Sequence, residues 1–221
     1  MEKKESYRRH SPHFQQPGQS YFVTWCIYNA VPAKALDNYA LQLKDISHQI
    51  DNVDKSDKER INQLKIEYSG IRKKYMKAFD DLLHQQSEVI VDLPKEENTR
   101  IILDTLSFWE GKRIENYAIC VMNNHVHWVL RVFEKDENGK PVYLQDILQS
   151  VKRFSANKIN DLENRTGTLW QDESYDITIR NDLHRHNAIE YTINNPVVAG
   201  LVKNWWDWGG TILFGKGLWQ R

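Results

Sequence analysis

The segment from Ile114 to Phe133 constrains the fold of this chain more than any other. It reads IENYAICVMNNHVHWVLRVF, and after Ile119 its apolar run is interrupted only at positions 122–124. Short apolar runs that are separated by a tight polar turn are typical of two paired β-strands. The sequence therefore predicts a β-hairpin at the centre of the fold.

Two histidines follow this turn directly. Alternate residues of a strand point to the same face, so His125 and His127 would present their imidazoles side by side while Trp128 faces apolar packing on the other side. Histidine is the commonest metal ligand in proteins, although most histidines bind no metal. Two interpretations stay open: a two-nitrogen metal clamp, and a half-buried polar face with ordinary partners.

The rest of the chain predicts a single domain that alternates strands and helices. A length of 221 residues suits one domain with a substantial core. Aromatic and β-branched residues at 21–28 predict a central strand, and we expect further strands near 179 and at 211–214. Helical periodicity predicts helices at 99–109, at 144–162, and from an N-cap at Asp182 to a point before Pro196.

Residues 36–86 have a different character. Apolar residues recur there at steps of three and four in two series, which indicates two helices with coiled-coil seams. Ser56 and Glu59 have the spacing of a capping box at the start of the second helix. We therefore expect an inserted antiparallel helical hairpin with a solvated outer surface, which could be shortened without unfolding the core. Its heptad pattern would also permit pairing with a second copy as a homodimer.

Charge and cysteine content limit the function classes. Lysine and arginine total 30, as do aspartate and glutamate, so any nucleic-acid contact must be local. Cys26 and Cys120 each lie in an apolar run, which predicts buried free thiols in a protein of a reducing compartment. The N-terminus is charged and no apolar run has membrane-spanning length. These features predict a cytoplasmic protein with no membrane partner.

A second pair of candidate residues lies ahead of Pro196. Tyr191 and Asn195 are four residues apart, so on a helix they share one face. Combined with the His-x-His strand, they supply a nucleophile, two imidazole ligands and an oxygen ligand. Those groups are the requirements for metal-assisted attack of tyrosine on a phosphodiester.

Three motifs, in this order, resemble the REP-associated tyrosine transposases, which belong to the single-tyrosine HUH nucleases and transposases. They are RRHSPHFQ at 8–15, MNNHVH at 122–127 and YTINNPVVAGL at 191–201. The chain departs from the family pattern at Asn123, where proline is usual, and in the long helical stretch before Glu88.

The resemblance implies an α+β, ferredoxin-like fold: an antiparallel sheet with helices packed on one face, plus the inserted helical hairpin. It also implies that His125, His127 and Asn195 bind Mg²⁺ or Mn²⁺ and that Tyr191 is the nucleophile. The expected activity is cleavage and strand transfer of single-stranded DNA beside short palindromic hairpins. The intermediate would be a 5′-phosphotyrosine, formed with release of a 3′-hydroxyl.

Because the chain has no net charge, we expect locally clustered cations to make the contacts with DNA phosphates. They lie in the N-terminal arm, at Arg8, Arg9, His10 and His13, and on the helix at 144–162, at Lys152, Arg153 and Lys158. On general grounds the lysines suit a solvated helix face equally well.

Four alternatives compete with this interpretation. Tyr175 is a rival nucleophile, although it lacks an oxygen ligand one helical turn away. A histidine-triad hydrolase would need a further histidine at position 129, which is Val129. A non-catalytic protein that binds hairpin DNA or RNA, and a metal phosphodiesterase that uses water, both remain open.

Overall fold

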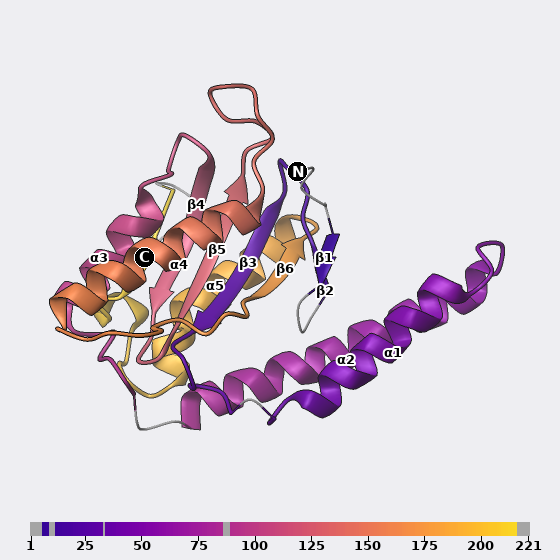
Figure 1. The fold of residues 1–221 in the computed structure, drawn as a ribbon, viewed down its shortest axis with the longest axis horizontal. Helices are drawn as coiled ribbons and strands as arrows, with labels where there is room; N and C mark the ends of the chain where they lie inside the picture. Colours follow the sequence, from indigo (N-terminus) through magenta and orange to yellow (C-terminus); the bar gives the residue numbers. More distant parts are fainter. Residues whose placement is uncertain (1–5, 9–11, 33, 86–88, 216–221) are drawn as a thin grey trace.

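The structure is a computed structural model and describes residues 6–8, 12–32, 34–85 and 89–215. Its centre is a five-stranded antiparallel sheet in the order β6-β3-β5-β4-β7. The strands are β3 (Ser20–Cys26), β4 (Ile114–Val121), β5 (His125–Val132), β6 (Tyr175–Ile179) and β7 (Thr211–Leu213). Figure 1 shows the strands side by side, with helices in front of and behind them.

The core has the ferredoxin-like β-α-β-β-α-β connectivity. It runs β3, α3 (Glu96–Ser107), β4, β5, α4 (Leu144–Leu162) and β6. Helix α5 (Asp182–Val198), the short 3₁₀ helix η1 (Trp205–Asp207) and the edge strand β7 follow this unit. The predicted α+β class and the antiparallel sheet are confirmed.

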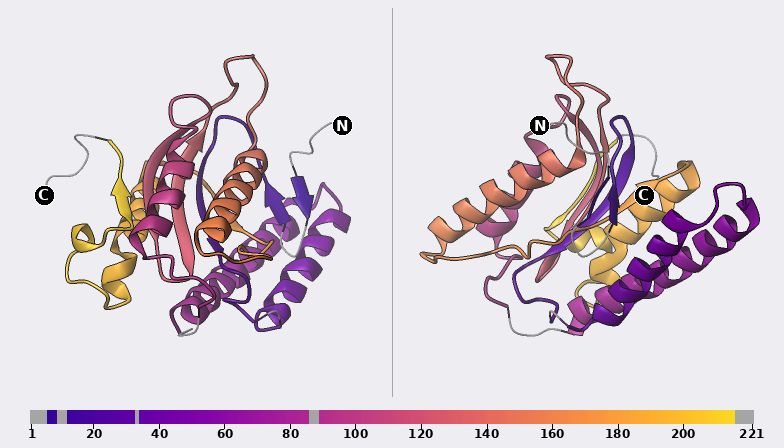
Figure 2. Two further views of the ribbon diagram at one scale, coloured as in Figure 1. Left: turned by 60° about the vertical axis from the view of Figure 1, so that its left-hand side comes forward. Right: turned by 45° about the vertical axis from the view of Figure 1, so that its right-hand side comes forward.

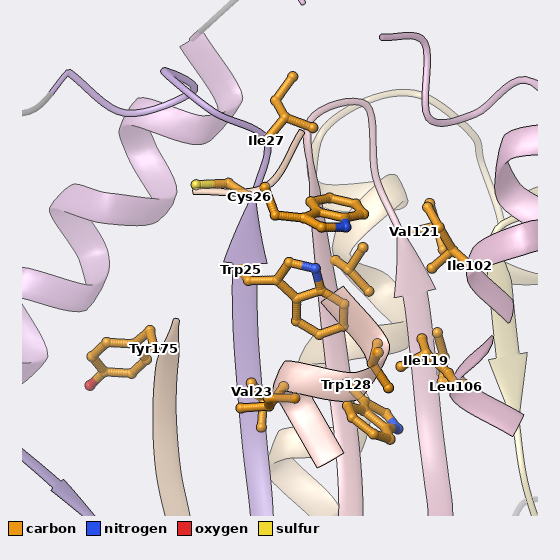
Figure 3. Packing of buried hydrophobic residues seen from close by; sticks show 14 of the residues in the cluster. Val23, Trp25, Cys26, Ile27, Ile102, Leu106, Ile119, Val121, Trp128 and Tyr175 are labelled. Atoms are coloured by element: carbon orange, nitrogen blue, oxygen red, sulfur yellow. The ribbon is translucent and has the colours of Figure 1, made fainter. Parts of the chain in front are cut away.

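Helices cover both faces of the sheet. On one face, α3 and α4 enclose a large apolar cluster that includes Trp25, Trp128 and Ile102 (Figure 3). On the other face, α5 packs with Ile189 and Ile193 against Phe22 and other residues of the sheet. The two helices of the ferredoxin-like unit thus share one face as expected, and α5 covers the face to which His125 and His127 point.

Strand alternation explains how the histidines reach that face. In β5, Val126, Trp128 and Leu130 join the cluster under α3 and α4, as the sequence predicts. Asn116 accepts a hydrogen bond from the indole of Trp128 at 2.6 Å, so the polar atom of this buried ring is satisfied. Packing of these large side chains fixes the strand register and directs the alternate residues, His125 and His127, to the α5 side.

The inserted segment forms α1 (Asp37–Asn52) and α2 (Lys58–Gln85), which extend from the sheet as a long hairpin (Figures 1 and 2). The helix start differs from the expected capping box, because Asp57 rather than Ser56 accepts the hydrogen bond from the backbone N–H of Arg60. Ser56 instead donates to Asp54 within the turn.

The second half of α2 packs into the core, so the prediction that the hairpin can be shortened without unfolding the core concerns its far end. Tyr75, Phe79 and Leu83 are buried in the same apolar cluster as the sheet residues. Arg72 donates hydrogen bonds to the hydroxyl of Tyr175 and to the backbone carbonyl of Asp176, both on β6. Only the far end of the hairpin lacks such links to the sheet among the described residues.

Three further expectations need correction or completion. Helix α5 continues past Pro196 to Val198, because a proline in the last turn removes only one backbone hydrogen bond. Its N-cap is Asn181, whose side chain accepts from the N–H of His184, rather than Asp182. The composition of the N-terminal arm, with Pro12, Pro17 and Gly18, predicts a loop. The arm instead contains two short paired strands, β1 (Ser6–Arg8) and β2 (Pro12–Phe14).

Cys26 and Cys120 are buried free thiols in the described part of the chain, as predicted. Burial raises the pKa of both thiols to about 12, so they are protonated and unreactive at neutral pH. No described helix combines the length and the apolar character that crossing a membrane requires.

Candidate functional site

The two histidines of β5 lie against each other and are almost completely buried. The Nε2 atoms of His125 and His127 are 3.0 Å apart, and both side chains are about 1% exposed or less. Burial lowers the pKa of His127 to about 3 and the pKa of His125 well below its usual value. Both imidazoles are therefore neutral at physiological pH, which is the form that binds metals.

The tautomer of His125 follows from its neighbours. Asn124 donates its amide N–H to the carbonyl of Leu83 at 2.9 Å, so its amide oxygen faces the His125 ring. His125 Nδ1 lies 2.7 Å from that oxygen and must carry the proton that it donates. The Nε2 of His125 is thereby left with a free lone pair.

The second imidazole has an adaptable partner. His127 Nδ1 lies 2.8 Å from the hydroxyl of Thr24, which sits opposite it on β3. Because a hydroxyl can donate or accept, Thr24 can support either tautomer of His127. When Nδ1 carries the proton, the Nε2 lone pair of His127 joins that of His125, as in metal sites whose histidines are oriented by outer hydrogen bonds.

Helix α5 brings the other two candidates over this pair. The ring of Tyr191 contacts that of His127 edge-on, with 5.3 Å between the centroids, and Phe22 packs against both rings. The buried Asn195 side chain lies close enough to both imidazoles and to Tyr191 to influence the pKa of all three groups. The four residues predicted from sequence for the chemistry are thus together in space.

Two nitrogen donors and one amide oxygen fit a divalent cation. The described residues contain no cluster of three or more histidine, cysteine, aspartate or glutamate side chains that could hold a metal. The donor set of this site is of another kind, since the amide of Asn195 completes the pair formed by His125 and His127. Neutral imidazoles suit Mn²⁺ better than the strongly oxygen-preferring Mg²⁺.

The inserted helix α2 contributes to this site, which the sequence did not indicate. Asp80 accepts a hydrogen bond from the hydroxyl of Tyr191 at 2.6 Å, and His84 Nε2 lies 3.4 Å from the amide oxygen of Asn195. The ring of His84 is also 5.9 Å from that of His125. The only sequence signal was the four-residue spacing of Asp80 and His84, which places them on one face of α2.

These surroundings set the ionisation of the tyrosine and its partner. Burial, followed by the carboxylate of Asp80, raises the pKa of Tyr191 above its ordinary value. Burial also raises the pKa of Asp80 to about 6, although the hydrogen bond from Tyr191 opposes this shift. At neutral pH the site therefore holds a protonated phenol in contact with a carboxylate that is mostly ionised.

Replacing Asp80 with asparagine should stabilise the protein at pH 7. The carboxyl has a higher pKa in the folded chain than its reference value of 3.8, so its contribution favours folding below about pH 4 and is lost as the pH rises through 6. We expect Asp80→Asn to raise the free energy of unfolding by about 1–3 kcal/mol at pH 7 and to have little effect at pH 4. Urea unfolding at both pH values measures this, and an equal effect at both would contradict the assignment.

The remaining candidates lie elsewhere. Tyr175 is buried in the core, stacks on Tyr75 and accepts a hydrogen bond from Arg72. Burial raises its pKa to about 12. These contacts match the interpretation of Tyr175 as a structural residue.

The predicted DNA-contact residues fall into two groups. Arg9 and His10 lie outside the described residues, as do the side chains of Arg8 and His13. On α4, the ammonium group of Lys152 donates to the carbonyls of Gln171, Asp172 and Glu173 and to the hydroxyl of Ser174. This cation is thus engaged within the protein, in contrast to the exposed side chains of Arg153 and Lys158.

Comparison with known proteins agrees with the motifs. No family model matches the chain. A curated relative from Haemophilus influenzae, named as a REP-associated tyrosine transposase, is 27% identical over 101 residues, which are 42% of this chain and 56% of the relative. The match thus spans little more than half of that relative's length. This similarity confirms the resemblance predicted from the motifs.

Among solved structures, the chain is similar to a REP-associated tyrosine transposase bound to a REP hairpin. The TM-score is 0.46 and the sequence identity 15%, and the alignment covers 93% of this chain and 80% of the other.

Proposed function

We propose, from the similarity of this chain to REP-associated tyrosine transposases, that it cleaves and rejoins single-stranded DNA beside short palindromic hairpins. The observation that carries the proposal is the convergence of Tyr191 and Asn195 of α5 on the buried pair of neutral histidines of β5. Burying several polar side chains together is costly, and such clusters of perturbed groups are commonly found at functional sites.

In the proposed reaction, the hydroxyl oxygen of Tyr191 attacks the scissile phosphorus. The products are a 5′-phosphotyrosine and a DNA end with a free 3′-hydroxyl. Attack of a 3′-hydroxyl on the phosphotyrosine reverses the step and rejoins DNA without an external energy source. The α5 helix positions the nucleophile, and the surrounding apolar residues of the sheet keep its ring in place.

A divalent ion, Mg²⁺ or Mn²⁺, would be held by the Nε2 atoms of His125 and His127 and by the amide oxygen of Asn195. When bound, it would supply Lewis-acid polarisation of the phosphate. Thr24 and Asn124 would orient the two imidazoles through their Nδ1 atoms.

The proposed DNA surface combines the N-terminal arm with α4. Gln15, directly after β2, accepts a hydrogen bond from the backbone N–H of Gln145, so this end of the arm lies beside the start of α4. Arg153 and Lys158 are exposed on α4, and Lys158 lies over the half-exposed ring of Phe154. Exposed cations beside an aromatic ring suit contacts to phosphates and to unpaired bases.

The proposal is tested by incubating the protein with a single-stranded DNA hairpin and Mn²⁺, followed by denaturing electrophoresis. A covalent protein–DNA species is the expected result. Cleavage without such a species would favour the metal phosphodiesterase that uses water, and binding without cleavage would favour the non-catalytic hairpin-binding protein.

Metal binding gives a separate prediction. His125→Ala and His127→Ala should lower Mn²⁺ affinity by more than about 100-fold, because removal of an outer hydrogen-bond partner alone typically lowers it by about 10–100-fold. Thr24→Val, which removes only such a partner, should fall in that lower range. Asn195→Ala should be milder than either histidine variant, and excess metal should partly restore its cleavage.

Titration calorimetry with Mn²⁺ measures these affinities without DNA. His186→Ala is the matched control, since His186 is an exposed residue at the start of α5. An unchanged affinity in His125→Ala would contradict the proposed ligand set.

A further inference from the structure

The inserted hairpin supplies part of the site, at the point where the tyrosine must lose its proton. Asp80 and His84 are one helical turn apart on α2, and they face Tyr191 and Asn195, which are one turn apart on α5. Each of these two contacts joins residues that are 111 positions apart in the sequence. The contact between α2 and α5 is therefore produced by the tertiary fold and not by closeness in the sequence (Figure 2).

The carboxylate of Asp80 is hydrogen-bonded to the hydroxyl oxygen of Tyr191, the atom that would attack phosphorus. Its Oδ2 accepts the hydroxyl proton of Tyr191 at 2.6 Å, a short distance typical of a hydroxyl that donates to a charged acceptor. Its Oδ1 is buried and has no hydrogen-bond partner among the described residues. Among the described residues, the side chain that donates a hydrogen bond to Asp80 is thus Tyr191, the proposed nucleophile.

Tyr191 needs such an acceptor. A phenol has an ordinary pKa of about 10 and is therefore protonated at neutral pH, and the hydroxyl of Tyr191 donates its proton to Asp80. The nearby histidines are poor alternatives, since the Nδ1 atoms of His125 and His127 are engaged by Asn124 and Thr24 and their Nε2 atoms belong to the proposed metal site. The proton must therefore leave during attack, to a base that is already in contact.

We propose that Asp80 is a catalytic base that accepts the proton of Tyr191 as its oxygen bonds to phosphorus. This inference rests on the proposed function. The bond between Tyr191 Oη and phosphorus forms while the bond from phosphorus to the 3′-oxygen breaks, and that oxygen keeps the electron pair and takes a proton from water. In the rejoining step, the attacking 3′-hydroxyl gives its proton to water as its oxygen bonds to phosphorus, and the Asp80 carboxylic acid returns its proton to the departing Tyr191 oxygen.

The test compares the single-turnover rate of adduct formation in Asp80→Asn and wild-type protein. Asparagine keeps the shape and can still accept a hydrogen bond from Tyr191, but it cannot take the proton. We expect the rate to fall by about 10²–10⁴-fold, the usual contribution of a general base, with hairpin affinity unchanged. Asp81→Asn is the matched control, because Asp81 is an exposed neighbour whose side chain is not bonded to Tyr191.

Chemical rescue separates a base from a merely structural group. Adduct formation by Asp80→Ala should be slowed as in Asp80→Asn. Added formate should raise the rate of adduct formation by Asp80→Ala in a concentration-dependent manner and should leave Tyr191→Phe inactive. A wild-type rate in Asp80→Asn, a loss that reflects weaker hairpin binding, or no rescue of Asp80→Ala by formate would each overturn the role of Asp80. All three leave the proposed function intact, whereas the absence of an adduct with wild-type protein would refute the proposed function itself.

Discussion

Tyr191→Phe should abolish the covalent protein–DNA adduct and hairpin cleavage while leaving hairpin binding in place. The substitution removes only the attacking oxygen, and the ring keeps its edge-on contacts with Phe22 and His127. We expect adduct formation to fall by at least about 10⁴-fold, as is usual when a nucleophile is removed. Denaturing electrophoresis measures the adduct, and a fluorescence binding assay measures the affinity for the hairpin.

This variant has a predictable effect on stability that must be controlled. Phenylalanine leaves the Asp80 carboxylate without its donor, so the free energy of unfolding should fall by about 1–3 kcal/mol. The double variant Tyr191→Phe/Asp80→Asn removes that unpaired charge and should restore stability without restoring cleavage. Tyr175→Phe is the second control and should form the adduct at the wild-type rate, because Tyr175 packs in the core.

Deletion of residues 37–85 should prevent the remaining chain from folding. Tyr75, Phe79 and Leu83 are each less than 10% exposed, and burial of one such side chain stabilises a protein by about 1.5–3 kcal/mol. Loss of all three therefore removes an amount comparable to the whole stability of a typical domain, about 5–15 kcal/mol. Circular dichroism and thermal unfolding of the purified variant measure the outcome.

A shorter deletion is the matched control. Replacing 50–61, at the far end of the hairpin, by a short glycine-rich turn keeps Asp80, His84 and the buried residues of α2. This variant should fold and still form the adduct. A folded, active protein after the full deletion would contradict the role given to α2.

The sequence predicted those strands and helices whose own residue pattern, a period of two or a spacing of four, indicates the structure. The alternating pattern around His125 and His127 predicted two strands and the face of each histidine correctly, because burial on one side of a strand leaves a period of two. The spacing of Tyr191 and Asn195 likewise predicted their common helical face. The errors were local: a proline in a last helical turn is tolerated, and Asp57 and Asn181 competed successfully with neighbouring polar residues for the N-cap positions.

Asp80 and His84 could not be predicted in the same way. On α2 they belong to a helix rich in charged residues, where such side chains usually face solvent. Their role depends on a contact between α2 and α5 across 111 residues of sequence. A periodicity within one helix contains no information about which distant helix its polar residues will meet.

The central claim is that Tyr191 forms a covalent bond to DNA. The most direct measurement is proteolytic digestion of the isolated protein–DNA adduct, followed by mass spectrometry of the modified peptide. We expect a phosphate-linked nucleotide on Tyr191. A modification that maps to Tyr175, or to any residue other than Tyr191, would contradict the claim.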